Sequence, residues 1–425
     1  MIDESASPAD GGVDPQTDAT AQPSIPSDGD RVARRTAELM MNPNILGDVV
    51  ARVREMGVAN EERTVKLLYL ALTSRVLSMP VSMVIKGASS SGKSFVLKSV
   101  LALFPESAYA VSASVSPKFI VYDDESYVHR VLVFEEWAGL NPDAQYFLRI
   151  LLSEGYVSHQ TLVGPSGLPE PKTLRKQGPT GLVLTTTAEK IHPENETRMI
   201  SVSVDDTPEQ TGQAIIATAE AYERTVTVDL ESHRQLQEVI AKLPNKVVIP
   251  FIEQLARGIA PVATRLRRDF KKIIGLIQAH ALLHRATRSV DPDGRVIATR
   301  EDYRAVYGIV ADLISEGVGA SVPEIVRETV EAVSALMLNY PEGVPGNAVA
   351  GALGVKPSNS SRRVKTAIAA GYLVNLEAST GKPQRLKLGA PMPVGGQVLP
   401  HPDHIGDDCA VAPNIGGATP PEVAP

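Results

Sequence analysis

Residues 87–94, GASSSGKS, constrain the fold of this chain more than any other stretch. The apolar run VSMVIK at 81–86 precedes them. SFVLKSVLALF at 94–104 follows, with the apolar spacing of a buried helix. A strand, a glycine-rich loop and a helix in this order predict an α/β domain with a mainly parallel sheet.

The loop matches the pattern G-x4-G-K-[ST]. Backbone N–H groups of such a loop, with the N-terminus of the next helix, can cradle phosphate oxygens. We expect Lys93 to reach the β- and γ-phosphates of ATP and the Ser94 hydroxyl to bind Mg²⁺. The other candidate nucleotide contacts are Gly87, Ser89, Ser90, Ser91, Gly92 and Phe95. The alternative is a glycine-serine turn that matches by chance.

A second apolar strand, within HRVLVFEEW at 129–137, ends in two carboxylates. Ligands collect at the carboxyl ends of parallel strands. Glu135 is therefore placed to hold the Mg²⁺ shell, and Glu136 to orient or deprotonate an attacking water. A glutamate beside the water favours hydrolysis over transfer to an acceptor. The alternative is a charged strand end that faces solvent.

Polar and basic residues follow two further elements. The strand GLVLTTTA at 181–188 ends in threonines, and a threonine there can hold the attacking water. Arg198 lies far from the phosphates of its own chain and suits an arginine finger supplied in trans. A surface ion pair with Glu194 or Glu196 is its alternative. Arg268, on a basic helix at 263–285, could reach the γ-phosphate or belong to a solvated face.

Composition bounds the rest of the chain. Its 425 residues are 43% hydrophobic, and the single cysteine, Cys409, cannot form an internal disulfide, so a cytoplasmic location is expected. Residues 1–30 and 391–425 read as disordered tails with seven and four acidic residues and no Lys or Arg. Setting these eleven charges aside turns the net charge of −7 into +4 for residues 31–390. A polyanion partner is permitted by that charge but not required.

The predicted organisation is a core at 31–207 with N-terminal helices, a helical lid at 208–320 and a C-terminal module at 324–390. Within the core, residues 156–178 have the pattern of a hairpin that contains Lys172, Arg175 and Lys176. These cations could touch DNA phosphates. The alternative is a surface flap with solvated basic residues.

The C-terminal module has three helical patterns and a final hairpin with a Gly-Lys-Pro turn. It resembles a winged helix, a helix-turn-helix variant. Its candidate DNA contacts are Arg362, Arg363, Lys365, Lys382, Arg385 and Lys387. A winged helix that binds protein is the alternative.

A phosphate loop, a strand ending in EE, a polar strand tip, a rim arginine and a lid arginine, in this order, resemble the AAA+ ATPases. Over residues 60–390 the chain is most similar to MCM-like and superfamily-three-like helicases of phages and mobile elements. The resemblance implies an AAA+ P-loop core with a helical lid and a winged helix. It makes Arg198 the finger, Arg268 the sensor-two arginine and 156–178 the pre-sensor hairpin. Thr187 replaces the sensor-one asparagine, and the N-terminal collar of the MCM proteins is absent.

The preferred hypothesis is a ring-forming, hexameric ATP-driven DNA helicase or translocase that replicates a mobile element. Its partners would be DNA, further copies of itself and other replication proteins of that element, and no membrane. The alternative is an AAA+ DNA-binding switch, loader or transcriptional regulator that does not unwind. A monomeric P-loop kinase is disfavoured by the two glutamates.

Overall fold

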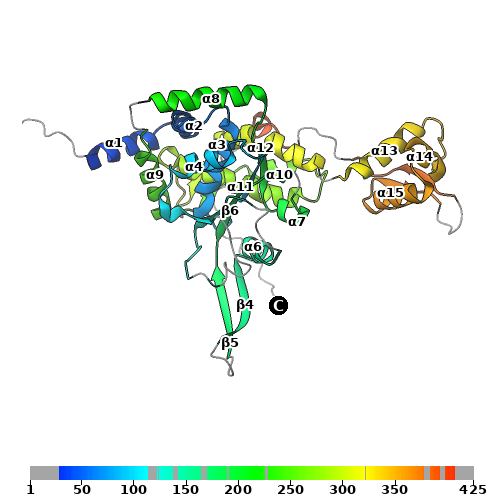
Figure 1. The fold of residues 1–425 in the computed structure, drawn as a ribbon, viewed down its shortest axis with the longest axis horizontal. Helices are drawn as coiled ribbons and strands as arrows, with labels where there is room; N and C mark the ends of the chain where they lie inside the picture. The colour runs from blue at the N-terminus through cyan, green and yellow to red at the C-terminus, as the bar shows by residue number, and fades with distance from the viewer. Residues whose placement is uncertain are drawn as a thin grey trace, which may run out of the picture.

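A computed structural model describes most of the chain (Figure 1). It covers residues 28–112, 122, 124–136, 142–163, 170–188, 191–224, 228–320, 322–377, 383–392 and 398–406.

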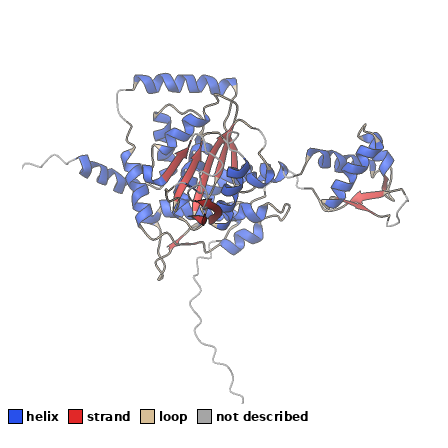
Figure 2. Cartoon of the chain, turned by 60° about the horizontal axis from the view of Figure 1, so that its bottom comes forward, coloured by secondary structure: helices blue, strands red, loops and turns tan. Residues whose placement is uncertain are grey.

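A five-stranded parallel sheet forms the centre of the molecule, with helices on both sides (Figure 2). The strand order is β2-β3-β6-β1-β7, so β6 lies between β3 and β1. Because every pair is parallel, the carboxyl ends of all five strands share one edge. The strands are β1 (Met83–Lys86), β2 (Tyr109–Ser112), β3 (Arg130–Phe134), β6 (Thr180–Thr186) and β7 (Ile200–Ser203).

One face of the sheet carries the main hydrophobic core. Met83, Ile85, Val131 and Val133 belong to it, as the alternation of side chains along a strand requires. The helices that contribute to the same core include α3 (Glu62–Thr73), α4 (Lys93–Leu101), α9 (Glu231–Lys242), α11 (Leu266–Leu283) and α12 (Arg300–Ala320). Residues 208–320, predicted as a lid of their own, are thus packed in part into the core of the sheet. Helical periodicity identifies an apolar face but not the surface that it covers.

The opposite face of the sheet has a smaller core. Val84, Leu132 and Phe134 pack there with α6 (Pro142–Glu154). Directly after α6, the strands β4 (Tyr156–Val163) and β5 (Glu170–Gln177) pair antiparallel from Tyr156↔Gln177 to Val163↔Glu170. This hairpin projects from the body of the molecule in Figure 1.

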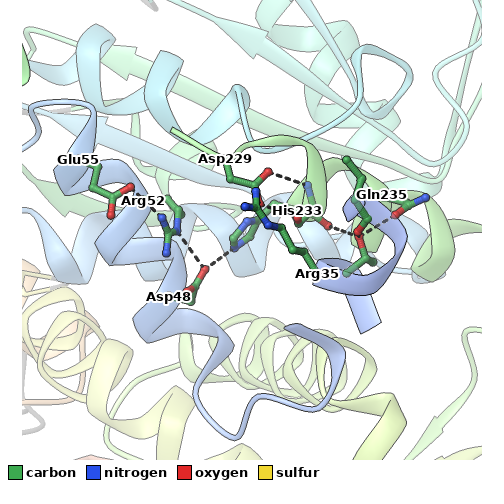
Figure 3. A network of polar contacts seen from close by, with 10 residues as sticks. Arg35, Asp48, Arg52, Glu55, Asp229, His233 and Gln235 are labelled. Carbon is green, nitrogen blue, oxygen red and sulfur yellow. Dashed lines mark hydrogen bonds and ion pairs between the residues drawn. The ribbon is translucent and has the colours of Figure 1, made fainter. Parts of the chain in front are cut away.

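Two N-terminal helices, α1 (Asp28–Met40) and α2 (Ile45–Glu55), precede the sheet, so residues 28–30 of the predicted tail are helical. Polar contacts tie both helices to α9 (Figure 3). His233, buried on α9, has its Nε2 3.2 Å from an Asp48 carboxylate oxygen, and this contact lowers the pKa of Asp48. Arg35 pairs with Asp229 at 3.2 Å. A cavity of about 560 Å³ lies among these residues.

Shorter elements complete the body. Helix α8 spans Pro208–Glu223 and crosses the top of the view in Figure 1. Strands β8 and β9 form a short parallel pair. The remaining bounds are α7 (Pro193–Glu196), β8 (Val247–Val248), α10 (Ile252–Gly258), β9 (Val296–Ile297) and the 3-10 turns Ser74–Val76, Glu106–Ala108, Arg285–Thr287 and Pro402–His404.

Residues 322–392 contain three helices and a three-stranded antiparallel sheet, here called the three-helix unit. The sheet order is β10-β12-β11. The unit has its own core, built by residues such as Val330, Val364 and Leu386. Its elements are α13 (Glu324–Leu336), β10 (Val344–Pro345), α14 (Gly346–Ala352), α15 (Pro357–Ala369), β11 (Leu373–Asn375) and β12 (Arg385–Leu388).

Residues 398–406, the closing segment, return from the three-helix unit to the main core. Val398, Leu399 and Ile405 are buried there, and the Tyr303 hydroxyl donates a 2.6 Å hydrogen bond to the carbonyl of Pro400. The predicted disordered tail at 391–425 is wrong for this segment, because averaging composition over the whole stretch hid its apolar residues. Residues 407–425 lie outside the described part.

Within the described residues, no single helix is long and apolar enough to cross a membrane. A bent pair, Arg300–Gly319 with Glu324–Leu336, passes by length and composition alone.

Candidate nucleotide site

The loop between β1 and α4 has a shape that its glycines permit. Gly92, just before α4, has φ +88°, a left-handed conformation that costs glycine little. A Cβ on Gly87 would stand 2.5 Å from the Val204 side chain, so only glycine fits there. Ser90 also has a positive φ, +64°. The N-terminus of α4, with its free N–H groups, therefore opens into the loop.

The Lys93 ammonium lies inside the loop. Its Nζ donates to the carbonyls of Gly87 at 2.8 Å and Ala88 at 2.5 Å, and its side chain is largely buried. The position is the one from which a lysine can exchange carbonyl oxygens for phosphate oxygens. Ser94 follows in the first turn of α4 and is half-buried, while Ser89, Ser90 and Phe95 are exposed.

The two glutamates lie directly after β3 at the edge where the loop begins. Glu135 is 3.1 Å from Lys98 Nζ, on the same helix as Ser94. Glu136 accepts a 3.3 Å hydrogen bond from the Thr186 hydroxyl. The carbonyl of Glu135 accepts a further bond from Thr185 Oγ1. The neighbouring strand β6 thus fixes the backbone of one acid and the side chain of the other.

Thr186, rather than the predicted Thr187, reaches the acidic pair. Thr186 is buried and stands opposite Lys86, the last residue of β1, whereas Thr187 is exposed beyond the strand. Side chains alternate along a strand, so only every second threonine can face Glu136. The sequence shows that neighbouring threonines point to opposite faces of the sheet, but it does not show which of them points to Glu136. Apart from its place on a predicted helix, nothing in the sequence indicated that Lys98 contacts Glu135.

The donors at this edge fit a magnesium-bound nucleotide. A serine hydroxyl and a carboxylate are oxygen ligands that Mg²⁺ accepts, and the loop with its lysine suits phosphate. The described residues contain no group of three or more His, Cys, Asp or Glu that could hold a metal ion. His280 and His284 instead stack at 4.5 Å beside buried Asp302, as expected for packing residues.

Three arginines, Arg149, Arg198 and Arg268, form a second site, here called the arginine cluster. Arg198 Nε donates to Ser153 Oγ at 2.8 Å, and Arg268 donates to Thr197 Oγ1 at 2.7 Å. Partial burial, with Arg268 and Arg149 nearby, lowers the pKa of Arg198. No sequence signal singles out Arg149, because it lies on α6, far along the chain from both Arg198 and Arg268.

The acids near Arg198 are paired with other cations. The Glu194 carboxylate binds Arg149 at 2.5 Å, and that of Glu196 binds Lys86 at 2.5 Å. The Arg198 guanidinium donates to the backbone carbonyl of Glu194 and to Ser153, and no contact with the Glu194 carboxylate is seen in the described part of the chain. The expected alternative, an ion pair with either acid, is therefore not seen among the described residues.

The arginine cluster lies away from the phosphate loop of its own chain. Arg198 precedes β7, whereas the loop follows the parallel strand β1. The four residues of β7 span about 13 Å between those two edges of the sheet. Arg268, predicted to reach a γ-phosphate or to belong to a solvated face, donates to Thr197 at the amino end of β7, away from the phosphate loop of the same chain.

The predicted DNA contacts on the hairpin divide into exposed and buried cations. Lys172 and Arg175 are exposed, and the Arg175 guanidinium lies 4.5 Å from the Tyr156 ring centroid. Lys176 is buried and donates to the Glu125 carbonyl at 2.6 Å, over the Tyr127 ring. Lys176 is thus not available to DNA phosphates and holds the base of the hairpin instead.

The predicted DNA contacts of the three-helix unit differ in exposure and in pairing, and none of the described ones is buried. Arg362 and Lys365 are exposed on α15. Arg363 is paired with Glu328 at 2.7 Å, and Arg385 donates to the Glu342 carbonyl at 2.8 Å. Lys387 is half-buried, and Lys382 lies outside the described residues.

A parallel sheet, a phosphate loop after β1 and an acidic pair two strands away define a P-loop nucleotide-binding domain. Residues 32–246, about half of the chain, match the family described as the MTBMA_p00010 P-loop domain, and the chain belongs to that family. The predicted P-loop α/β fold is thereby confirmed. The matched range includes Lys93, Glu136 and Arg198 but ends before Arg268 and the three-helix unit. No curated protein matches the chain.

Proposed function

We propose that this protein is an ATP-hydrolysing motor that acts on DNA as a ring, in the manner of a hexameric AAA+ helicase or translocase. One observation carries the proposal. The phosphate loop and the Glu136–Thr186 pair share one edge of the sheet, while the arginine cluster lies at the other. Because the described arginine cluster does not reach the phosphate loop of its own chain, this arrangement supports a second chain as the source of the arginine.

Hydrolysis in this proposal uses groups with separate tasks. Lys93 exchanges the carbonyls of Gly87 and Ala88 for phosphate oxygens. Ser94 and Glu135 would hold Mg²⁺, which neutralises phosphate charge. Glu136, oriented by Thr186, accepts a proton from the attacking water. Arg198 of a neighbouring chain stabilises the charge that develops in the transition state.

Two exposed groups of cations support DNA as the substrate. Lys172 and Arg175 lie on a hairpin that projects from the body, and Arg362 and Lys365 lie on α15. The three helices and antiparallel sheet around α15 resemble a winged helix, whose equivalent helix enters the major groove. Lysine and arginine at such positions suit phosphate contacts.

An unwinding assay on forked DNA tests the proposal. The wild-type protein should separate the strands only with hydrolysable ATP. Glu136→Gln should bind a fluorescent ATP analogue and lose hydrolysis and unwinding, by about 100-fold or more. Glu154→Gln, an exposed acid on α6, is the matched control. An assembled protein that hydrolyses ATP without unwinding or moving along any DNA would contradict the motor.

A DNA-binding switch, loader or transcriptional regulator is the second candidate, and the exposed cations of α15 favour it equally. It requires ATP-dependent DNA binding without strand separation. Arg362→Glu with Lys365→Glu should then abolish binding to duplex DNA while ATP hydrolysis persists. Unchanged DNA binding in this variant would count against any role of α15 in recognition.

A further inference from the structure

Helix α8 exposes its large apolar side chains. Ile215 is 66% exposed, Ile216 52% and Tyr222 91%, and Gln210 is the one buried residue of the helix. At 3.6 residues per turn, Ile215, Ala219 and Tyr222 share one face, and Ala217 and Ala221 lie on the other. The usual pattern is inverted, with small side chains toward the protein and large ones toward solvent.

Among the described residues, few contacts hold α8 to the body. The Gln210 side chain donates to the carbonyl of Ala59 at 2.7 Å, and Ala217 and Ala221 approach Gly57. A lone helix of 16 residues is marginal in water, and most helices gain stability by burying an apolar face. A stripe at i, i+4 and i+7 spacing is the pattern by which helices anchor to partners.

The charge of α8 narrows the choice of partner. The helix carries Glu209, Glu220 and Glu223 and no Lys or Arg. Nucleic acid and anionic lipid are therefore disfavoured, since both are negatively charged. A partner surface with cations and exposed aromatic groups is favoured.

The location of α8 narrows the choice of partner further. The helix follows β7, whose carboxyl end lies at the same edge as the phosphate loop. Gly57, which contacts α8, is also near the ring of Phe95, next to Ser94. A molecule bound on α8 would therefore stand beside the loop, where the proposed mechanism needs a second chain.

The face with the arginine cluster has the matching chemistry. Exposed Arg267, Arg268 and Lys271 lie within about one quarter of the circumference of α11, beside Arg198. Tyr146, 52% exposed, lies 5.8 Å from the Arg149 guanidinium. This face is basic with an exposed aromatic ring, whereas α8 is acidic with an apolar stripe.

We infer that α8 of one copy docks on the arginine-cluster face of a second copy and so brings Arg198 to the neighbouring phosphate loop. The inference rests on the shared site of the proposed function. Because the two surfaces are different, the contact is head-to-tail. A pair of copies joined in this way still has one free α8 and one free arginine-cluster face, to which further copies can bind. Such contacts close into rings when the rotation allows it.

The stripe is tested in the full-length protein with a non-hydrolysable ATP analogue. Ile215→Asp with Tyr222→Asp should weaken assembly, measured as particle mass, by about tenfold for each buried side chain lost. The variant should still bind a fluorescent ATP analogue as a monomer. Gln213→Asp, at an exposed position on the side of the same helix opposite the stripe, should assemble like wild type.

A charge reversal tests the partner face. Glu223, beside the stripe, is the acid to reverse: Glu223→Lys should weaken assembly, as should Arg267→Glu with Lys271→Glu, and all three changes in one chain should restore part of it. Absence of restoration would overturn the assignment of this face. None of these residues belongs to the proposed catalytic groups.

The outcomes separate this inference from the proposed function. Wild-type assembly and ATPase in the Ile215→Asp, Tyr222→Asp variant would overturn the docking of α8 and leave the shared site standing. Binding of the wild-type protein to neutral phosphatidylcholine vesicles, lost in this variant while assembly is unchanged, would also overturn the docking, because a membrane would then be the occupant of the stripe. A wild-type protein that hydrolyses ATP as a monomer would overturn both.

Discussion

At the scale of single residues, two buried groups control stability without touching the candidate site. Arg75 is 2% exposed and has no carboxylate partner among the described residues, and burial lowers its pKa to about 10. Its charge is satisfied by carbonyl oxygens and by the Gln237 side chain, whose Oε1 lies 2.7 Å from Nη1. A buried cation of this kind depends on each of its acceptors.

Gln237→Leu should therefore lower the free energy of unfolding by about 2–3 kcal/mol, since it leaves Arg75 short of an acceptor. Adding Arg75→Met should recover part of the loss, because the charge that lacks a partner is then gone. Urea unfolding followed by circular dichroism measures both variants. Equal stability of Gln237→Leu and wild type would show that Arg75 finds another acceptor.

His284 should make the protein less stable as the pH falls. Burial, with His280 and Arg288 nearby, lowers the pKa of His284 from 6.5 to about 4. The unfolded chain then takes up a proton first, so stability falls from about pH 6.5 down to about pH 4 and is constant below. The loss attributable to this group is about 3 kcal/mol.

His284→Leu should flatten that part of the curve of urea midpoint against pH. The comparison is made as a difference from wild type, because Asp48 and Asp302 have lowered pKa values and contribute to the same acid limb. Parallel curves for the two proteins would mean that His284 does not set this loss.

At the scale of elements, strands and loops follow the sequence closely, and the partners of helices do not. The pattern of 156–178 predicts two strands, and β4 and β5 form there because the turn-rich segment GPSGLPEP separates two alternating runs. The same pattern could not remove Lys176 from the predicted DNA contacts, since only the contact with Glu125 shows which face of the strand is covered. Strand alternation gives two faces, and tertiary contacts decide between them.

The closing segment is the element whose contribution is easiest to measure. Leu399 is 1% exposed in the main core, so Leu399→Ala should cost about 2–4 kcal/mol of stability. Asp403→Ala, which breaks an exposed ion pair with Arg304, should cost less than about 1 kcal/mol. Thermal unfolding of the full-length variants gives both values. Similar costs for the two would mean that the segment is held by its surface contacts.

At the scale of the whole molecule, the order of the predicted strands and helices along the chain indicated the parallel sheet but not which helices cover it. A strand, loop and helix at 81–104 and an apolar strand before Glu135 were enough to place the phosphate loop and the acids at one edge. That α9, α11 and α12 cover the same face as α4 required contacts between residues more than a hundred positions apart. Periodicity is a local property and does not encode them.

A mixing experiment tests whether the site is shared. Arg198→Ala and Lys93→Ala should each hydrolyse ATP poorly, because one lacks the cation for its neighbour and the other cannot hold phosphate. Mixed in equal amounts, they should recover part of the wild-type rate, since some interfaces then combine an intact loop with an intact Arg198. No recovery in mixed assemblies of confirmed mass would place Arg198 outside the neighbouring site.

The closing segment also has a consequence for synthesis. Val398, Leu399 and Ile405 belong to the main core, yet they are made after the whole three-helix unit. Chains emerge from the ribosome amino end first, and domains fold as units in that order. The core begun by residues near position 39 therefore has its last apolar residues added only after position 398 has emerged. The three-helix unit, with a core contained within residues 322–392, can be complete before the domain that precedes it.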